Sequence, residues 1–161
     1  MNIHSTNKDF STPAYKYGIL QGKSYRVLQN NLAGVLSPFN LSISEWKLIS
    51  LVFEHKKIRV AHLAEALSVD PPLITKLVTG LEKKQLVNKV QDSIDKRVTF
   101  ITANKKLEAL LPQVEIYVKK DIRRLFAGIA PQEFLIYIKV LQTVIDQDNS
   151  SSSKYTSLTD S

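Results

Sequence analysis

The stretch that decides the fold is residues 60–102, VAHLAEALSVDPPLITKLVTGLEKKQLVNKVQDSIDKRVTFIT. Residues 60–67 have the apolar spacing of a short helix, and residues 71–84 have the spacing of a second one. Residues 86–90 and 97–102 are typical of two strands joined by a charged hairpin. This order predicts a winged helix-turn-helix, a fold that places its second helix in a DNA major groove.

The start of the second helix in this stretch is marked by two residues. Asp70 is of a type that caps helices, and Pro71 suits the first helical position, where no backbone N–H is needed. The helix then buries one apolar stripe, and its opposite face carries the side chains expected to meet a DNA groove. Those outward-facing side chains are Pro72, Leu73, Thr75, Lys76 and Thr79.

The return strand of the hairpin alternates in polarity. Val98 and Phe100 fall on one side of it, which predicts an apolar face and a mixed face. Thr102 ends the strand and is expected to cap a long helix that begins near residue 103. Pro112 lies within that helix and is expected to kink or break it.

The remaining segments predict helices on both sides of this core. Residues 42–45, Ser-Ile-Ser-Glu, are a capping box that opens a helix. Pro38 ends the helix before it, and Pro131 begins the last one. The expected fold is therefore mainly α with a small β-hairpin wing. Its predicted parts are a flexible arm at 1–13, a winged helix domain at 14–147 and a disordered tail at 148–161, with the DNA-binding core at about 42–102 and dimerisation helices at about 14–37 and 103–147.

The flanking helices carry more apolar residues than a compact winged domain needs. This excess predicts a homodimer, because two-fold symmetry is the usual way for such a module to match a palindromic site. A single monomeric bundle is the alternative.

The positive charge of the chain is concentrated in the same region as the helix-turn-helix pattern. The 161 residues carry a net charge of +7. Residues 55–106 hold eleven Lys or Arg and five Asp or Glu, so this third of the chain accounts for +6. A basic segment alone is usually a solvated surface, but its coincidence with the motif indicates a polyanion-binding face.

Several classes of function are excluded or disfavoured by composition. The chain has no cysteine, which excludes disulfides, thiolate nucleophiles and thiol-based peroxide sensing. His4, His55 and His62 form no metal-ligand pattern, and glycine is too scattered for a phosphate cradle. No enzyme, metal or cofactor is therefore expected. No apolar run reaches the length of a membrane span and no secretory signal is present, so a cytoplasmic location is the default expectation.

The pattern as a whole resembles the MarR family of bacterial transcriptional regulators over residues 15–147. The segment 63–69, Leu-Ala-Glu-Ala-Leu-Ser-Val, is similar to the family's first motif helix, and Ile-Thr-Lys-Leu-Val at 74–78 is similar to the core of its recognition helix. Asp-Lys-Arg at 95–97, followed by Ile-Thr at 101–102, is similar to the family's wing and is the most specific part of the likeness. Two departures are Gln85, where glycine is common, and Leu73, where small polar residues are common.

The resemblance implies a homodimeric regulator of transcription, commonly a repressor, that binds double-stranded DNA at a pseudo-palindromic operator. It also implies release by a small anionic or aromatic effector bound between the dimer helices and the winged domain. The residues expected to serve such an effector are Lys23, Arg26, Trp46 and Tyr117, although surface cations and core aromatics would have the same composition.

The candidate DNA contacts follow from chemistry and position. Thr75 and Lys76 lie early on the second helix, where Lys76 would either donate to guanine or meet only phosphate. Arg97 would either enter an A/T-rich minor groove or pair with Asp95 to stiffen the hairpin. The resemblance implies both roles, with Asp95 orienting and Arg97 reaching. The expected phosphate contacts are Ser42, Ser44, Arg59, Lys89 and Lys96.

A winged-helix protein-interaction module without DNA binding is the serious alternative. It would use the same fold without a basic face. Salt dependence separates the two, because binding to DNA phosphates weakens steeply as ionic strength rises.

Overall fold

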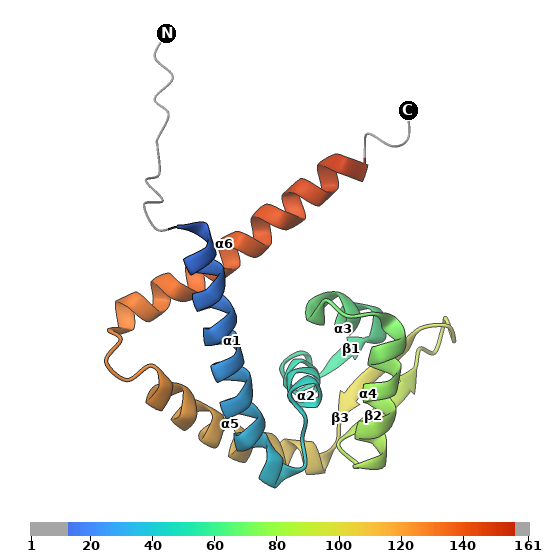
Figure 1. The fold of residues 1–161 in the computed structure, drawn as a ribbon. Coiled ribbons are helices and arrows are strands. Elements are labelled where there is room, and N and C mark those ends of the chain that lie inside the picture. Colours follow the sequence, from blue (N-terminus) through green and yellow to red (C-terminus); the bar gives the residue numbers. More distant parts are fainter. Residues whose placement is uncertain (1–12, 157–161) are drawn as a thin grey trace. The chain divides into compact units, whose positions relative to one another are not determined.

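The computed structural model describes residues 13–156, in which helices and a small sheet follow in the order of Figure 1. The contacts divide the chain into two compact units, one up to Asp121 and one from Ile122 onward. Residues 1–12 of the expected arm and residues 157–161 of the expected tail lie outside the described residues. The elements are α1 (Ala14–Leu36), the 3-10 helix η1 (Ser37–Phe39), α2 (Ile43–His55), β1 (Lys57–Arg59), α3 (Val60–Leu67), α4 (Pro71–Lys83), β2 (Val87–Gln91), β3 (Thr99–Ala103), α5 (Lys105–Leu125) and α6 (Pro131–Thr156).

The fold is the predicted one, mainly helical with a three-stranded antiparallel sheet of order β1-β3-β2. The hairpin formed by β2 and β3 is the wing, and its tip extends past α4 (Figure 1). The sequence did not predict β1, which pairs along the free edge of β3 with Ile58 opposite Ile101. Three residues are too short for an alternating pattern to be recognised.

A single core positions α4 against the rest of the first unit. Side chains from α2, α3, α4, β3 and α5 meet in it and exclude water completely. Each such leucine or isoleucine contributes roughly 1.5–3 kcal/mol by leaving water. Because the inner face of α4 is held this firmly, its outer face has a fixed direction. The fully buried core residues include Leu48, Ile49, Leu63, Ile74, Val78, Leu81, Ile101, Leu107 and Val114.

The helix starts were predicted with mixed success. The capping box at Ser42 and Glu45 is formed in both directions, and α3 has the predicted bounds. Asp70 and Pro71 take the N-cap and first positions of α4, but the Asp70 side chain makes no capping hydrogen bond. Its backbone carbonyl instead accepts from Leu73 at 3.0 Å.

One expectation for α5 was wrong. Thr102 lies within β3, and Asn104 caps the helix instead, with its Oδ1 accepting from the backbone N–H groups of Lys106 and Leu107 at 3.0 and 3.1 Å. Pro112 lies inside α5 without breaking it. Proline removes one backbone hydrogen bond from the helix. The helix continues because buried side chains on both sides of Pro112, such as Leu107 and Val118, anchor it in the core.

The predicted apolar face of the return strand is not the core face. Ile101 is the fully buried residue of β3, whereas Val98 and Phe100 are only half-buried. Side chains alternate along a strand, so Phe100 lies on the face opposite to Ile101. The aromatic ring is thus left on the outer surface of the sheet.

The second unit contains the last residues of α5, the turn that follows and α6. The rings of Phe126, Phe134 and Tyr137 pack together in edge-to-face and tilted pairs, with centroids 4.8–6.4 Å apart. The helix continues to Thr156, past residue 148, where the tail was expected to begin. Large apolar side chains along it are exposed. No helix in the described part of the chain is long and apolar enough to cross a bilayer.

Candidate nucleic-acid interface

A groove of about 480 Å³ lies between the start of α4 and the base of the wing. It brings together four of the predicted DNA contacts, each from a different element. Arg59 precedes α3, Thr75 lies on α4, Lys89 on β2, and Arg97 in the loop before β3. The apolar walls of the groove are Val60, Ala61, Pro71, Val78 and Val98.

The outer face of α4 is exposed, as the sequence predicted. Pro72, Leu73, Thr75, Lys76 and Thr79 all lie on the surface, and Leu73 keeps 43% of its area in contact with solvent. Thr75 and Thr79 donate their hydroxyl protons to backbone carbonyls one turn earlier, at 3.1 and 2.8 Å. Their hydroxyl oxygens are therefore oriented as acceptors.

Lys76 and Lys89 differ although both are exposed. Lys76 has no ion pair among the described residues. Lys89 pairs with Glu82 at 2.6 Å and its Nζ lies 3.4 Å from the hydroxyl of Thr79. An ion pair at the surface is worth little, so Lys89 can exchange Glu82 for a phosphate at small cost.

The wing tip is ordered by short acidic side chains. Asp92 Oδ1 accepts from the backbone N–H groups of Ile94 and Asp95 at 2.9 and 3.0 Å. These backbone hydrogen bonds from Asp95 and Ile94 are the largest effects on the pKa of Asp92, which lies below its ordinary value.

Asp95 acts on Arg97 through the backbone. Its Oδ1 accepts from the Arg97 N–H at 3.0 Å, and its backbone carbonyl accepts from Val98 at 2.9 Å. The ion pair weighed from the sequence, Asp95 with the Arg97 guanidinium, is not among the salt bridges of the described residues. Lys96 and Arg97 are both exposed.

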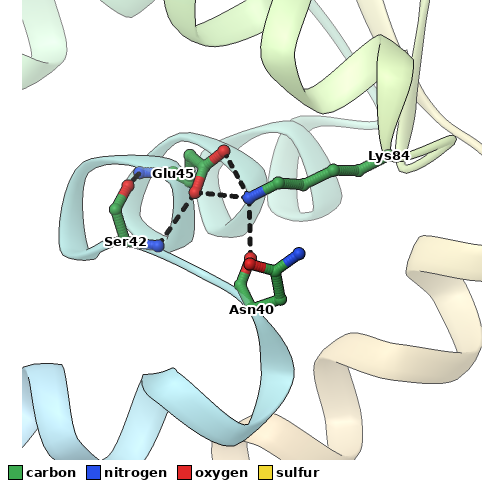
Figure 2. A network of polar contacts seen from close by, with 4 residues as sticks. All are labelled: Asn40, Ser42, Glu45 and Lys84. Atoms are coloured by element: carbon green, nitrogen blue, oxygen red, sulfur yellow. Dashed lines mark hydrogen bonds and ion pairs between the residues drawn. The ribbon is translucent and has the colours of Figure 1, made fainter.

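The C-terminal end of α4 is tied to the start of α2. Lys84 Nζ donates to both carboxylate oxygens of Glu45, at 2.8 and 2.9 Å, and to the Asn40 carbonyl at 2.6 Å (Figure 2). The same carboxylate accepts from the Ser42 backbone N–H at 2.8 Å. Burial raises the pKa of Glu45, but the hydrogen bonds from Lys84 and Ser42 outweigh it and leave the pKa below its ordinary value.

This network was missed by sequence reasoning. Glu45 was recognised only as the third residue of a capping box, and Lys84 only as one of many cations. The partners are 39 residues apart in sequence, and the charge pattern gives no signal for such a pair. Lys84 is therefore a structural cation, and the positive charge available to a ligand is smaller than the sequence count.

Ser42 and Ser44 lie apart from the groove between α4 and the wing. They line a separate cavity of about 710 Å³ beside Lys84 and Lys47, against Tyr25 and Gln29 of α1. Both serines are exposed, and the Ser42 hydroxyl oxygen accepts the capping hydrogen bond from Glu45 at 3.2 Å. Their assignment as phosphate contacts remains a prediction.

The four residues predicted for an effector are not gathered around that cavity. Trp46 donates its indole N–H to Glu115 at 3.2 Å, and Tyr117 stacks on Phe39 with ring centroids 5.6 Å apart. Lys23 and Arg26 are exposed on α1. None of the four is among the residues that line the 710 Å³ cavity.

Residues 41–99, which contain the groove, match the model of the MarR family. The chain carries a MarR-family domain. The matched range runs from the residue before the capping box of α2 to the first residue of β3, so it includes α3, α4 and most of the wing.

Individual known proteins are also similar to this chain. The HTH-type transcriptional regulator YhbI of Bacillus subtilis is 24% identical over 96 residues, which span 60% of this chain and 62% of that protein. CouR from Rhodococcus jostii RHA1, solved bound to p-coumaroyl-CoA, gives a TM-score of 0.73 with 22% identity over 80% of this chain and 90% of its own. A mutant MarR from E. coli complexed with operator DNA gives 0.71 with 20% identity, over 83% and 99% of the two chains. At these identities the structural likeness establishes the winged-helix fold.

Proposed function

We propose that this MarR-family chain is a DNA-binding transcriptional regulator that uses α4 and the wing as its reading surface. The observation that carries the proposal is the groove of about 480 Å³, where exposed Arg59, Thr75 and Arg97 converge on one side of the domain. Phosphates supply affinity and base edges supply specificity. In this proposal Thr75 and Lys76 contact base edges, and Arg97 enters a narrow minor groove.

We propose that the regulator works as a homodimer on a pseudo-palindromic operator, as a repressor. Each candidate dimerisation element carries exposed apolar side chains that a soluble monomer rarely shows in such number. On α1 these are Tyr15, Tyr17, Ile19, Leu20, Tyr25 and Val27, and on α6 they are Leu135, Ile136, Ile138, Val140, Leu141, Val144 and Ile145.

A small anionic or aromatic ligand is the proposed release signal. The support comes from CouR, which was solved with p-coumaroyl-CoA, and from the 710 Å³ cavity of this chain. Lys47 and Tyr25 line that cavity, so a carboxylate on an aromatic or conjugated body is the chemistry that fits it.

Selection of bound fragments from random duplex DNA tests the function directly. The expected product is an inverted repeat whose half-sites are separated by about one helical turn. Recovery of asymmetric single sites would contradict the dimer. Failure to retain any DNA at low salt would contradict the regulator and favour a protein-interaction module.

A further inference from the structure

The outer face of the small sheet carries a second basic surface that the groove between α4 and the wing does not include. A shallow groove of about 560 Å³ is lined there by His55, Lys57, Arg59, His62 and Phe100, with Glu65 as its acidic member. These residues come from the end of α2, from β1, from α3 and from β3. We define the outer basic face as His55, Lys57, Arg59, His62 and Phe100.

The Phe100 ring contacts both cations of this face. Its ring is on the surface because Ile101, its neighbour in β3, takes the core position. Lys57 Nζ lies 4.0 Å from the ring centroid and the Arg59 guanidinium carbon lies 5.5 Å from it. Both distances are within the range of cation–π attraction, so the ring holds two cations in place.

The two cations are not neutralised by ion pairs. Neither Lys57 nor Arg59 takes part in a salt bridge within the described residues. Their charge is felt by Asp92, whose pKa is lowered first by backbone hydrogen bonds and in smaller part by Lys57 and Arg59. A cation that is already drawn to the ring loses less side-chain freedom on meeting an oxyanion.

The turn that directs Lys57 outward has an unusual backbone. Lys56, between α2 and β1, has φ 63° and ψ −43°, a conformation that side chains disfavour. This backbone conformation allows the chain to turn from α2 into the edge strand β1 within one residue. Such outliers often accompany function, and here the outlier accompanies the exposed pair Lys57 and Arg59.

Arg59 joins the two surfaces. It lines both the outer groove and the groove between α4 and the wing. We infer that the outer basic face binds backbone phosphates of the same DNA duplex, beyond the bases that α4 reads, with Lys57 and Arg59 as the charge and Phe100 as the positioning residue. This inference rests on the proposed function and extends its footprint.

The test is the salt dependence of duplex binding for the full chain and its Lys57→Gln variant. A random-sequence duplex of about 40 base pairs is the probe, since phosphate contacts do not depend on sequence. Loss of one phosphate contact is expected to reduce the slope of log K against log salt by about one unit for each subunit on DNA. Binding near 0.1 M salt is expected to weaken roughly three- to tenfold.

Two further variants sharpen the result. Phe100→Leu keeps both cations but removes the ring, and it is expected to weaken binding in the same direction by a smaller factor. Lys120→Gln removes an exposed cation of α5 and is the matched control, expected to leave affinity and slope unchanged. Far-ultraviolet circular dichroism and thermal unfolding confirm that each variant is folded.

The outcomes separate the two proposals. If the wild type binds DNA but Lys57→Gln has the wild-type slope, the outer basic face is not a DNA contact while the regulator stands. If Lys57→Gln and Lys120→Gln lower the slope equally, the effect is one of net charge and the inference is wrong. If inorganic pyrophosphate binds the outer face while DNA binding is unaffected by Lys57→Gln, the face serves a small anion. If the wild type binds no duplex, both proposals are wrong.

Discussion

The two ends of α4 use the same kind of residue in opposite ways. At the N-terminal end, Lys76 is exposed and has no ion pair within the described residues. At the C-terminal end, Lys84 is held by three acceptors on Glu45 and Asn40. One end is open to a partner, whereas the other fixes the helix to the N-terminus of α2.

A basic segment is therefore not one surface. Lys84 forms an ion pair with Glu45, and Lys89 forms one with Glu82. Lys76 and Arg97 are exposed and form no ion pair within the described residues. We call the part of α4 around Lys76 the open end and the part held by Lys84 the closed end. The open end can contact the same bases each time only if the helix does not rotate, and the Lys84 contacts at the closed end restrain that rotation. Mutations at the closed end should therefore act on stability, and mutations at the open end on binding.

The largest expected effect is at the closed end. Lys84→Met removes the counter-ion of a carboxylate that is only 9% exposed, and should lower the free energy of unfolding by roughly 2–3 kcal/mol. Urea unfolding followed by circular dichroism measures it. Lys83→Met, at the adjacent exposed position, is the control and should change stability by less than about 0.5 kcal/mol. Equal losses for the two variants would deny Lys84 a special role.

The next effect is at the open end. Lys76→Ala should weaken binding to a selected operator by about 1–3 kcal/mol if the ammonium reads a base. The unfolding free energy should stay near that of the wild type, because the side chain is exposed. Titration against the operator and against random DNA makes the distinction, since an equal loss on both would reduce Lys76 to a phosphate contact.

The carboxylate of the closed end predicts a pH dependence. The pKa of Glu45 in the folded state lies below its ordinary value of 4.5, so its stabilisation is present above that value and is lost as pH falls through the lower folded-state pKa. Wild type should therefore lose roughly 1–2 kcal/mol more than Glu45→Gln between neutral pH and about pH 3. Unfolding curves at several pH values check this, and parallel pH profiles for the two proteins would refute it. The glutamine keeps the capping acceptor, so the comparison isolates the charge.

The smallest effect is at the exit from α4. Gln85 has φ 58°, the left-handed region in which glycine is unstrained. Gln85→Gly should stabilise the fold by about 0.5–1 kcal/mol without changing DNA affinity. Lys83→Gly, at the last residue of α4, should have the opposite sign and cost up to about 1 kcal/mol. A destabilised Gln85→Gly protein would mean that the glutamine side chain contributes more than its backbone costs.

Much of the fold was predictable because it depends on local patterns. The capping box of α2, the bounds of α3 and the start of α4 each follow from a few neighbouring residues. The exposed positions of α4 followed from helical periodicity. Their roles on DNA remain predictions, because exposure alone does not identify a contact.

The parts that were missed depend on partners distant in sequence. β1 exists because β3 offers an edge, and three residues cannot show this by themselves. The strand faces were misassigned because an aromatic side chain such as Phe100 is usually expected in the core. The sequence gives no sign of its cation–π contacts with Lys57 and Arg59, which lie about 40 residues earlier. The cap of α5 was misplaced by two residues because Thr102 is needed in β3.

The most direct test of the account is the salt dependence of operator binding for the wild type and a Lys76→Ala/Arg97→Ala double variant. We expect log K to fall steeply and linearly with log salt for the wild type. For the double variant we expect a slope smaller by about one to two units for each bound subunit, with both proteins equally stable. Identical affinities and slopes for the two proteins would contradict the claim that the open end of α4 and the wing hold the DNA.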